Sequence, residues 1–314
     1  MAEAAEGEHE LVAFGVVSLR ARRQVDAALR DLDVTRRIVA LPPSAHIWRT
    51  LWSRAAYPPV ERLAGPLDVF HFSDWMYPRQ RDGLRSTLIH DLVPLHFPDL
   101  VHPRTRRQNL AKYKHAVQTC DVIVVNSEYT ANDVAEHLKF PRERVIVARP
   151  GVDERFAPEG PRHEEDGPYV LMLSPDEPRK NYHRLADAVD LVRARRPELQ
   201  LLAPAWVEED ELPAIYRGAT VFAYPSLFEG FGMPVLEAMA CGTPVVASSH
   251  PSLNEACGDA AVRADPLSAV AIASAIESAL VERQALVDKG LAHARRFTWR
   301  ACGEAHLDGF ETGT

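Results

Sequence analysis

The chain has 314 residues, of which 46% are hydrophobic and 25% charged, and its formal net charge is −8. This length allows one large domain or two ordinary domains, each with its own core. The acidic balance disfavours a nucleic-acid-binding protein, because such proteins are normally basic.

Four scattered cysteines, Cys120, Cys241, Cys257 and Cys302, include no CxxC pair. They fit a reducing compartment better than a disulfide framework or a zinc knuckle. No apolar run approaches the roughly 20 residues that cross a membrane. The small, acidic start lacks the features of a signal peptide. We therefore expect a cytoplasmic protein.

Short β-branched runs alternate with helical patterns through the first half of the chain. The runs are almost continuously hydrophobic, as expected of parallel strands covered on both faces of a sheet. After the fifth run, Ser127 can cap a helix in which Val134 and Leu138 lie four residues apart. The predicted strands are 11–17, 37–41, 67–72, 86–90, 121–127 and 144–151.

A polar segment at 157–168, rich in Pro, Gly and charge, interrupts this alternation. We interpret it as an interdomain linker. The alternation of strands and helices then resumes, which predicts a second doubly wound α/β domain with a parallel sheet. The predicted domains are 1–156 and 157–298, and a final helix at 299–314 could cross back to the first domain. The predicted strands here are 169–174, 199–204, 220–226 and 243–249.

The segment LFEGFGMPVLEAMACGTPVVA (227–247) joins a predicted strand to a helix that begins near Pro234. Proline is favourable at a first helical position, and glycines at 230 and 232 let a ligand approach the backbone closely. The backbone amides of Phe231, Gly232 and Met233 would then form an anion site at the helix N-terminus.

Glu229 and Glu237 flank this turn. A carboxylate accepts hydrogen bonds at both oxygens, which suits the vicinal hydroxyls of a ribose or a hexose. The segment could therefore present amides to a phosphate and carboxylates to sugar rings. An ordinary strand–turn–helix with a capping glutamate is the alternative, and the turn alone leaves both interpretations open.

Adjacent cations, Arg179 and Lys180, follow the first strand of the second domain. A guanidinium beside an ammonium suits a diphosphate leaving group, although the pair could equally be a solvated surface pair. The carboxyl ends of parallel strands meet at one edge of a sheet, so these cations and the Glu229–Glu237 turn belong to the same edge. Together they favour a binding site, and we expect Lys180 and Glu229 to face an open cleft.

SLFEGFGMPVLEAMACGTPVVAS, taken with EPRKN, closely resembles the retaining glycosyltransferases of group 1, or family 4, and their mannosyltransferases in particular. The two glutamates match that family's E-x7-E motif. Other typical segments are LIHDLVPLHFPDL (88–100), DVIVVNSEYTANDV, ARPGVDERFAP, ELPAIYRGA and CGDAA. The resemblance implies a GT-B fold of two Rossmann-like domains facing across a cleft. It also implies a metal-independent enzyme of polysaccharide biosynthesis that uses a nucleotide-diphosphate sugar and no cofactor.

The resemblance assigns roles to the matched residues. Arg179 and Lys180 would hold the donor diphosphate and stabilise charge as the sugar–phosphate bond breaks. Glu229 would contact the donor hexose, and Glu237 the nucleotide ribose. The donor-binding backbone would be that of Gly230, Phe231, Gly232 and Met233.

In the first domain, the resemblance makes His90 a catalytic candidate that faces the donor sugar, with a capping or core histidine as the alternative. Ser127 and Gly151 are secondary candidates, more in keeping with structural roles. Trp48, Trp52 and Trp75 could line an acceptor cleft or pack in the interior.

Family members usually open with a strand, a glycine-bearing loop and a helix, whereas this chain starts at the pattern of the second strand. We expect a gap in the first sheet, with unpaired backbone groups on both of its neighbours. Three interpretations stay open: a working transferase, a catalytically impaired relative that binds sugar nucleotides, and a phosphorylase-like or epimerase-like GT-B protein.

The donor would be GDP-mannose or a UDP-sugar, and the acceptor a glycan or a lipid-linked glycan. The basic segment 102–117 is a candidate for peripheral contact with the inner face of a membrane, and a solvated helix face is the alternative. Its cations are Arg104, Arg106, Arg107, Lys112 and Lys114.

Overall fold

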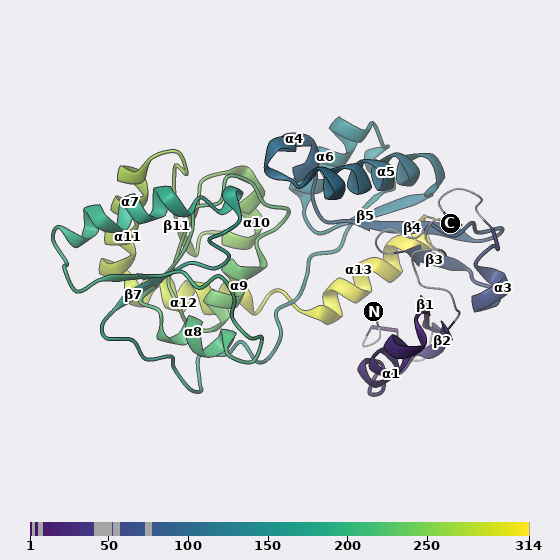
Figure 1. Cartoon of the computed structure of the whole chain (residues 1–314), viewed down its shortest axis with the longest axis horizontal. Coiled ribbons are helices and arrows are strands. Elements are labelled where there is room, and N and C mark those ends of the chain that lie inside the picture. Colours follow the sequence, from purple (N-terminus) through teal and green to yellow (C-terminus); the bar gives the residue numbers. More distant parts are fainter. Residues whose placement is uncertain (2–3, 6–8, 41–51, 53–56, 73–76, 314) are drawn as a thin grey trace. The chain divides into compact units, whose positions relative to one another are not determined.

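The computed structural model describes residues 1, 4–5, 9–40, 52, 57–72 and 77–313 (Figure 1). The chain divides into two compact units. Unit 1 comprises Met1–Arg149 and Trp299–Thr314, and unit 2 comprises Pro150–Thr298. None of the helices in these described parts is long and apolar enough to cross a membrane.

The described strands of unit 1 form two parallel sheets. In the smaller sheet, β1 (Val12–Val17) pairs with β2 (Thr35–Ala40). The larger sheet has the order β3-β4-β5-β6. Its strands are β3 (Val69–Phe72), β4 (Leu84–Ile89), β5 (Val122–Val125) and β6 (Val145–Val147).

Among the described residues, no strand joins β1 to β3. In the described part of the chain, the strands of unit 1 therefore form two separate sheets. Side chains bridge the two sheets instead, since the ring of Phe14 on β1 packs edge-on against that of Phe70 on β3, with 6.5 Å between centroids.

Helices cover both faces of the larger sheet of unit 1. On one face, apolar residues of α5 and α6 pack against β3, β4 and β5. On the other face lies the C-terminal helix α13, through Cys302 and Phe310. The helices of unit 1 are α1 (Leu19–Ala28), α3 (Glu61–Ala64), α4 (Val93–His96), α5 (Pro103–Thr119), α6 (Glu128–Leu138) and α13 (Trp299–Thr312).

Unit 2 contains one parallel sheet with the strand order β11-β10-β9-β7-β8. β11 was not predicted, because its four residues, AVRA, carry an arginine and only a short apolar pattern. The edge position of β11 makes a longer hydrophobic run unnecessary. The strands are β7 (Tyr169–Leu171), β8 (Gln200–Leu202), β9 (Val221–Tyr224), β10 (Val245–Ser248) and β11 (Ala261–Ala264).

Alternate residues of the central strands enter two separate cores. Tyr169 and Leu171 of β7 join the cluster that includes α8 and α9, whereas Val170 joins the cluster with α7 and α11. This arrangement confirms the predicted doubly wound parallel sheet. The helices are α7 (Tyr182–Arg193), α8 (Leu212–Gly218), α9 (Met233–Ala240), α10 (Asn254–Cys257), α11 (Ala269–Val281) and α12 (Arg283–Ala294).

The polar segment 157–168 lies within unit 2. The buried guanidinium of Arg217, on α8, donates hydrogen bonds to the carbonyl oxygens of Ala157 (3.1 Å), Glu159 (3.0 Å) and Pro161 (2.7 Å). One side chain thus satisfies three backbone acceptors in a segment that has no regular structure.

Candidate functional site

The segments that follow β7 and β9 meet at the carboxyl edge of the sheet in unit 2, because these two strands are neighbours. Leu227 N donates to the carbonyl of Arg179 at 2.9 Å. Asn181 Nδ2 donates to the carbonyls of Pro225 (3.1 Å) and Pro266 (2.7 Å), which follow β9 and β11. Asn181 has φ 70°, a left-handed conformation that Asn tolerates better than most residues. It thereby joins the ends of three strands.

This junction brings together Arg179, Lys180 and Glu229. Arg179 Nη1 lies 2.6 Å from Glu229 Oε2, and Lys180 Nζ lies 2.9 Å from Glu229 Oε1. Lys180 and Glu229 are each only 7% exposed. The expectation that both face an open cleft is therefore wrong: they form a buried ion cluster in which one carboxylate separates two cations.

The charges of this cluster determine its protonation. Burial alone would raise the pKa of Glu229, but Lys180 and Arg179 outweigh it and the pKa of Glu229 is lowered. Burial lowers the pKa of Lys180, and Glu229 only partly offsets that effect. Burial alone would lower the pKa of Arg179, but its acidic neighbours, chiefly Glu229, outweigh burial, and the pKa of Arg179 is raised. Glu229 therefore stays ionised between its two partners.

Tyr224, the last residue of β9, was not singled out from the sequence. Its hydroxyl accepts a hydrogen bond from Lys180 Nζ at 2.5 Å. Burial, followed by the charge of Glu229, raises the pKa of Tyr224 well above its usual value. The sequence analysis placed Tyr224 within a buried strand. Its position at the carboxyl end of that strand, where ligands bind in such sheets, could have marked it as a site residue.

The turn after Glu229 is also packed rather than open. Gly232 has φ 103° at the N-cap of α9, and a Cβ there would lie 2.5 Å from Leu253 Cδ2. The Phe231 ring is 2% exposed and packs against Phe297. Gly230 is buried and Met233 is partly buried. Phe231 could therefore offer a ligand only its backbone.

Ser226, at the start of this turn, is a further residue that the sequence analysis missed. It is 1% exposed, and its hydroxyl has no hydrogen-bond partner in the structure. A buried hydroxyl without a partner is costly. Ser226 lies two residues after the end of β9, on the segment that leads to Glu229.

Glu237, on α9, has a different environment. Tyr216 donates its hydroxyl proton to Glu237 Oε2 at 2.9 Å. Burial raises the pKa of Glu237, while the Tyr216 hydrogen bond and the charge of Arg155 act in the opposite direction and only partly compensate. Tyr216, from α8, was also missed, because nothing in the sequence links it to a glutamate on the next helix.

His90 belongs to unit 1 and is exposed directly after β4. Ile89 is in register with Val125, so His90 and Asn126 leave adjacent strand ends. The side-chain oxygen of Asn126 is buried and has no hydrogen-bond partner in the structure. The carboxyl edge of the larger sheet in unit 1 therefore carries an imidazole and an unsatisfied amide oxygen.

The secondary candidates that the structure describes, Ser127, Gly151 and Trp52, are all buried. Ser127 caps α6 as predicted, since its Oγ accepts a hydrogen bond from Thr130 N at 3.0 Å. Gly151 is buried. Trp52 is buried and donates its indole N–H to the Pro58 carbonyl at 2.9 Å, which indicates packing. Trp48 and Trp75 lie outside the described residues.

The basic segment forms helix α5. Lys112 is only 3% exposed, so it does not belong to a solvated face. The other cations of this segment, Arg104, Arg106, Arg107 and Lys114, are exposed.

Two family models match parts of the chain. Residues 3–156 match the family described as "Glycosyltransferase Family 4", and residues 204–292 match "Glycosyl transferases group 1". The first match contains His90, and the second contains Glu229 and Glu237.

Two curated relatives come from Escherichia coli. The chain is 27% identical to O-antigen chain mannosyltransferase B over 285 residues, which cover 77% of this chain and 74% of that protein. It is 28% identical to the serotype-specific mannosyltransferase WbdA over 268 residues, which cover 70% of this chain but only 32% of WbdA.

Among solved structures, the chain resembles Anabaena HepE, crystallised in complex with UDP. The TM-score is 0.65 at 14% sequence identity, and the alignment covers 97% of this chain and 100% of HepE. At this identity the likeness concerns the fold.

Proposed function

Because this chain belongs to the group 1, or family 4, glycosyltransferases of GT-B fold, we propose that it moves a hexose from a nucleotide-diphosphate sugar to a glycan or lipid-linked acceptor. We further propose that the anomeric configuration is retained and that neither a metal nor a cofactor takes part. GDP-mannose is the first donor to test, because two of the relatives are mannosyltransferases. UDP-sugars come next, because HepE was crystallised with UDP.

The observation that carries this proposal is the buried cluster of Arg179, Lys180 and Glu229. In the buried part of this cluster, two cations face one carboxylate, that of Glu229. Glu177 also pairs with Arg179 at 2.8 Å, but half of the Glu177 side chain is exposed. An incoming diphosphate could therefore displace Glu177, while Glu229 keeps the two cations in place.

In the proposed reaction, the bond between the anomeric carbon and the diphosphate oxygen breaks, and its electron pair stays on that oxygen. Arg179 and Lys180 stabilise the charge that develops there, in a site where burial strengthens electrostatic interactions. The acceptor hydroxyl forms the new bond on the same face of the sugar. Its proton passes to the departing diphosphate.

Glu229 and Glu237 would hold the sugars on either side of the diphosphate. Glu229 would contact the donor hexose and Glu237 the ribose. Tyr216 would orient the Glu237 carboxylate for that contact, because its hydroxyl occupies one carboxylate oxygen. His90 and the unsatisfied Asn126 oxygen would serve the acceptor side or the donor sugar from unit 1.

The exposed cations of α5 suggest how a lipid-linked acceptor could be reached. Arg104, Arg106, Arg107 and Lys114 could rest on an anionic membrane surface, each contributing about 1 kcal/mol. The protein would then work at the cytoplasmic face of a membrane. Binding to vesicles with and without anionic lipid tests this part of the proposal.

Isothermal titration calorimetry with GDP and UDP, followed by transfer assays with each sugar nucleotide and polyprenyl-linked acceptors, tests the function. We expect binding of one nucleotide and a product whose anomeric configuration, read by NMR, is that of the donor. Absence of binding at millimolar nucleotide would contradict the proposal.

The same assays separate the alternatives. Binding without turnover on any acceptor would point to an impaired relative, and phosphate-dependent cleavage of a glycan to a phosphorylase. The matched families and the names of the relatives are those of transferases, so these alternatives are not favoured.

A further inference from the structure

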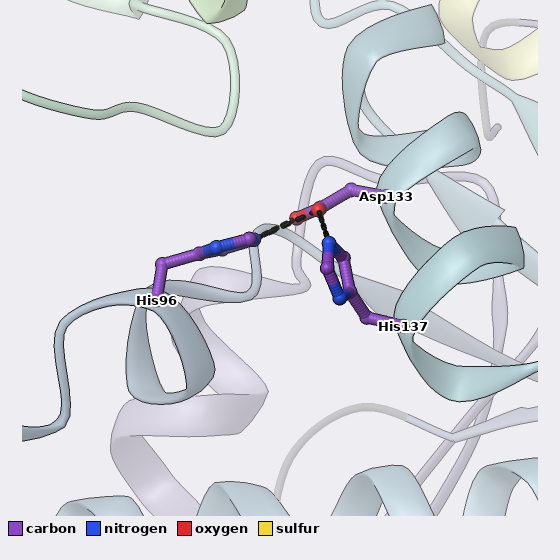
Figure 2. Close-up of side chains that lie close together, drawn as sticks. All are labelled: His96, Asp133 and His137. Carbon is purple, nitrogen blue, oxygen red and sulfur yellow. Dashed lines mark hydrogen bonds and ion pairs between the residues drawn. The ribbon is translucent and has the colours of Figure 1, made fainter.

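Three side chains of unit 1 converge on one point outside the residues assigned above. His96 comes from α4, and Asp133 and His137 come from α6 (Figure 2). His96 Nε2 lies 2.8 Å and 2.9 Å from the two oxygens of Asp133. His137 Nε2 lies 3.4 Å from Asp133 Oδ1. Both imidazoles therefore direct the same nitrogen toward one carboxylate.

Local structure explains this convergence. Asp133 and His137 are four residues apart on a helix, so they share a face. His96 is positioned by the segment after β4. At the start of α4, Asp91 Oδ1 accepts a hydrogen bond from Val93 N at 2.9 Å. The hydroxyl of Tyr113, on α5, donates to the Asp91 carbonyl at 2.9 Å.

The burial of the three side chains suits a bound ion. The side chain of Asp133 is 6% exposed, whereas those of His96 and His137 are 25% and 42% exposed. The carboxylate is thus held in the interior, and the imidazoles border solvent. An ion could enter from that side and keep a water molecule as a further ligand.

The donor set is selective. Two imidazole nitrogens with one carboxylate are typical of Zn²⁺ sites that keep an open position, and they are poor ligands for Mg²⁺ or Ca²⁺. The ligand atoms of the three side chains lie within 4.8 Å of one another. Ligands of a tetrahedral Zn²⁺ at bond lengths of 2.0–2.1 Å are separated by about 3.3 Å, so small side-chain adjustments would suffice.

A histidine–carboxylate hydrogen bond that merely links two helices is the simpler explanation. Unit 2 contains a histidine–carboxylate contact of similar length that links no helices, because His163 Nε2 lies 2.8 Å from Glu165 Oε1 within the irregular segment 157–168. The His96–Asp133–His137 cluster has a second imidazole, that of His137, one turn after Asp133 on α6. The ring centroids of His96 and His137 are 4.9 Å apart. That second imidazole is what an ion needs and a helix link does not.

We propose that His96, Asp133 and His137 bind one divalent transition-metal ion, with Zn²⁺ the best match. The ion lies between the two imidazole nitrogens and the carboxylate, and any proton on a coordinating nitrogen is released on binding. It ties α4 to α6 and so stabilises unit 1 around the segment that begins at His90. It has no part in the reaction proposed above, whose cations come from unit 2.

Calorimetric titration of metal-free full-length protein with ZnCl₂ tests the proposal, with MgCl₂ as the comparison. We expect one Zn²⁺ per chain and no binding of Mg²⁺ at the same concentrations. His137→Ala should weaken Zn²⁺ binding by about 100-fold or more, since even the residues that orient metal ligands contribute 10–100-fold. The control His163→Ala removes an imidazole whose Nε2 lies 2.8 Å from Glu165 Oε1, and this variant should bind Zn²⁺ like the wild type.

Two further measurements separate a lost ligand from a lost fold. Zn²⁺ should raise the Tm of the wild type and of His163→Ala, but not that of His137→Ala or Asp133→Asn. Co²⁺ should give visible absorption bands in the wild type that disappear in both cluster variants. Unchanged Zn²⁺ affinity in folded His137→Ala and Asp133→Asn would overturn the proposal, as would the absence of any Zn²⁺ binding by the wild type.

Discussion

Glu229 and Glu237 stand at the two ends of one turn, and burial disfavours the charge of both. For Glu229, the cations of Arg179 and Lys180 outweigh burial and lower the pKa. For Glu237, the hydrogen bond from Tyr216 and the more distant charge of Arg155 do not outweigh burial, and the pKa is raised. Two carboxylates from one short motif thus have pKa values shifted in opposite directions.

This difference in pKa favours different roles for the two glutamates. The Glu229 carboxylate already pairs with two cations, so in the proposed function it would be the fixed anion that holds them ready for a diphosphate. The Glu237 carboxylate lacks a close cation, so hydroxyl donors from a ligand would relieve part of its burial cost. Four predictions test this contrast between Glu229 and Glu237, in order from the largest expected effect to the smallest.

Lys180→Met removes one cation while keeping an aliphatic chain of similar length. We expect kcat/KM to fall about 100- to 1000-fold, because a preorganised charge at the leaving group is lost. Steady-state transfer assays with the preferred donor measure the effect. Lys289→Met, at an exposed position of α12, is the matched control and should keep full activity. Activity within tenfold of the wild type in folded Lys180→Met would contradict the assigned role.

Glu229→Gln keeps the shape of the side chain but removes the charge that separates the two cations. We expect turnover to fall about 100-fold, since the cations lose the partner that positions them. The affinity for GDP or UDP should stay the same or increase, because the site becomes more positive. Calorimetry together with kcat measures both effects. Weaker nucleotide binding with unchanged kcat would be incompatible with this account.

Glu237→Gln should have the reverse signature. We expect the Kd for the nucleoside diphosphate to rise about tenfold, the size of a lost charge-assisted hydrogen bond. Inhibition by inorganic pyrophosphate should be unchanged, since pyrophosphate carries no ribose. A pure rate effect with unchanged nucleotide affinity would argue against a ribose contact.

The two glutamines should also change stability with pH in opposite directions. The pKa of Glu229 is lowered on folding, so its contribution to stability is present above pH 4.5 and is lost as pH falls through the folded pKa. Glu229→Gln should therefore be less stable than the wild type at pH 7, and the gap should close in acid.

The pKa of Glu237 is raised on folding, so its cost to stability is absent in acid and develops as pH rises above 4.5. Glu237→Gln should gain stability relative to the wild type as pH rises to 7. Thermal unfolding monitored by circular dichroism from pH 3.5 to 7 checks both differences. Parallel curves for the two variants would show that the contrast between the glutamates is wrong.

The metal cluster shows what one sequence could and could not reveal about function. His96 lies in a segment that the family resemblance already covered, yet Asp133 comes 37 residues later and His137 four residues after that. Asp133 and His137 read as ordinary polar positions of an amphipathic helix. Only the folded structure, in which His96 Nε2 reaches the Asp133 carboxylate, shows that the three side chains share one point.

The sequence by itself determined the fold class and singled out the candidate donor-binding residues. Continuous apolar runs predicted buried parallel strands, and Arg179, Lys180, Glu229 and Glu237 lie in motifs that are contiguous in the chain. Proximity along the chain and the period of apolar residues are local properties, and local properties can be read without coordinates.

Only the tertiary structure decided how those residues are surrounded. It placed Lys180 and Glu229 in the interior, and it brought Tyr224 to Lys180 across 44 residues and Tyr216 to Glu237 across 21. It also showed that the short strand β11 completes the sheet. Burial and distant partners shift the charge of a carboxylate in either direction, and they depend on packing between strand ends that lie far apart in sequence.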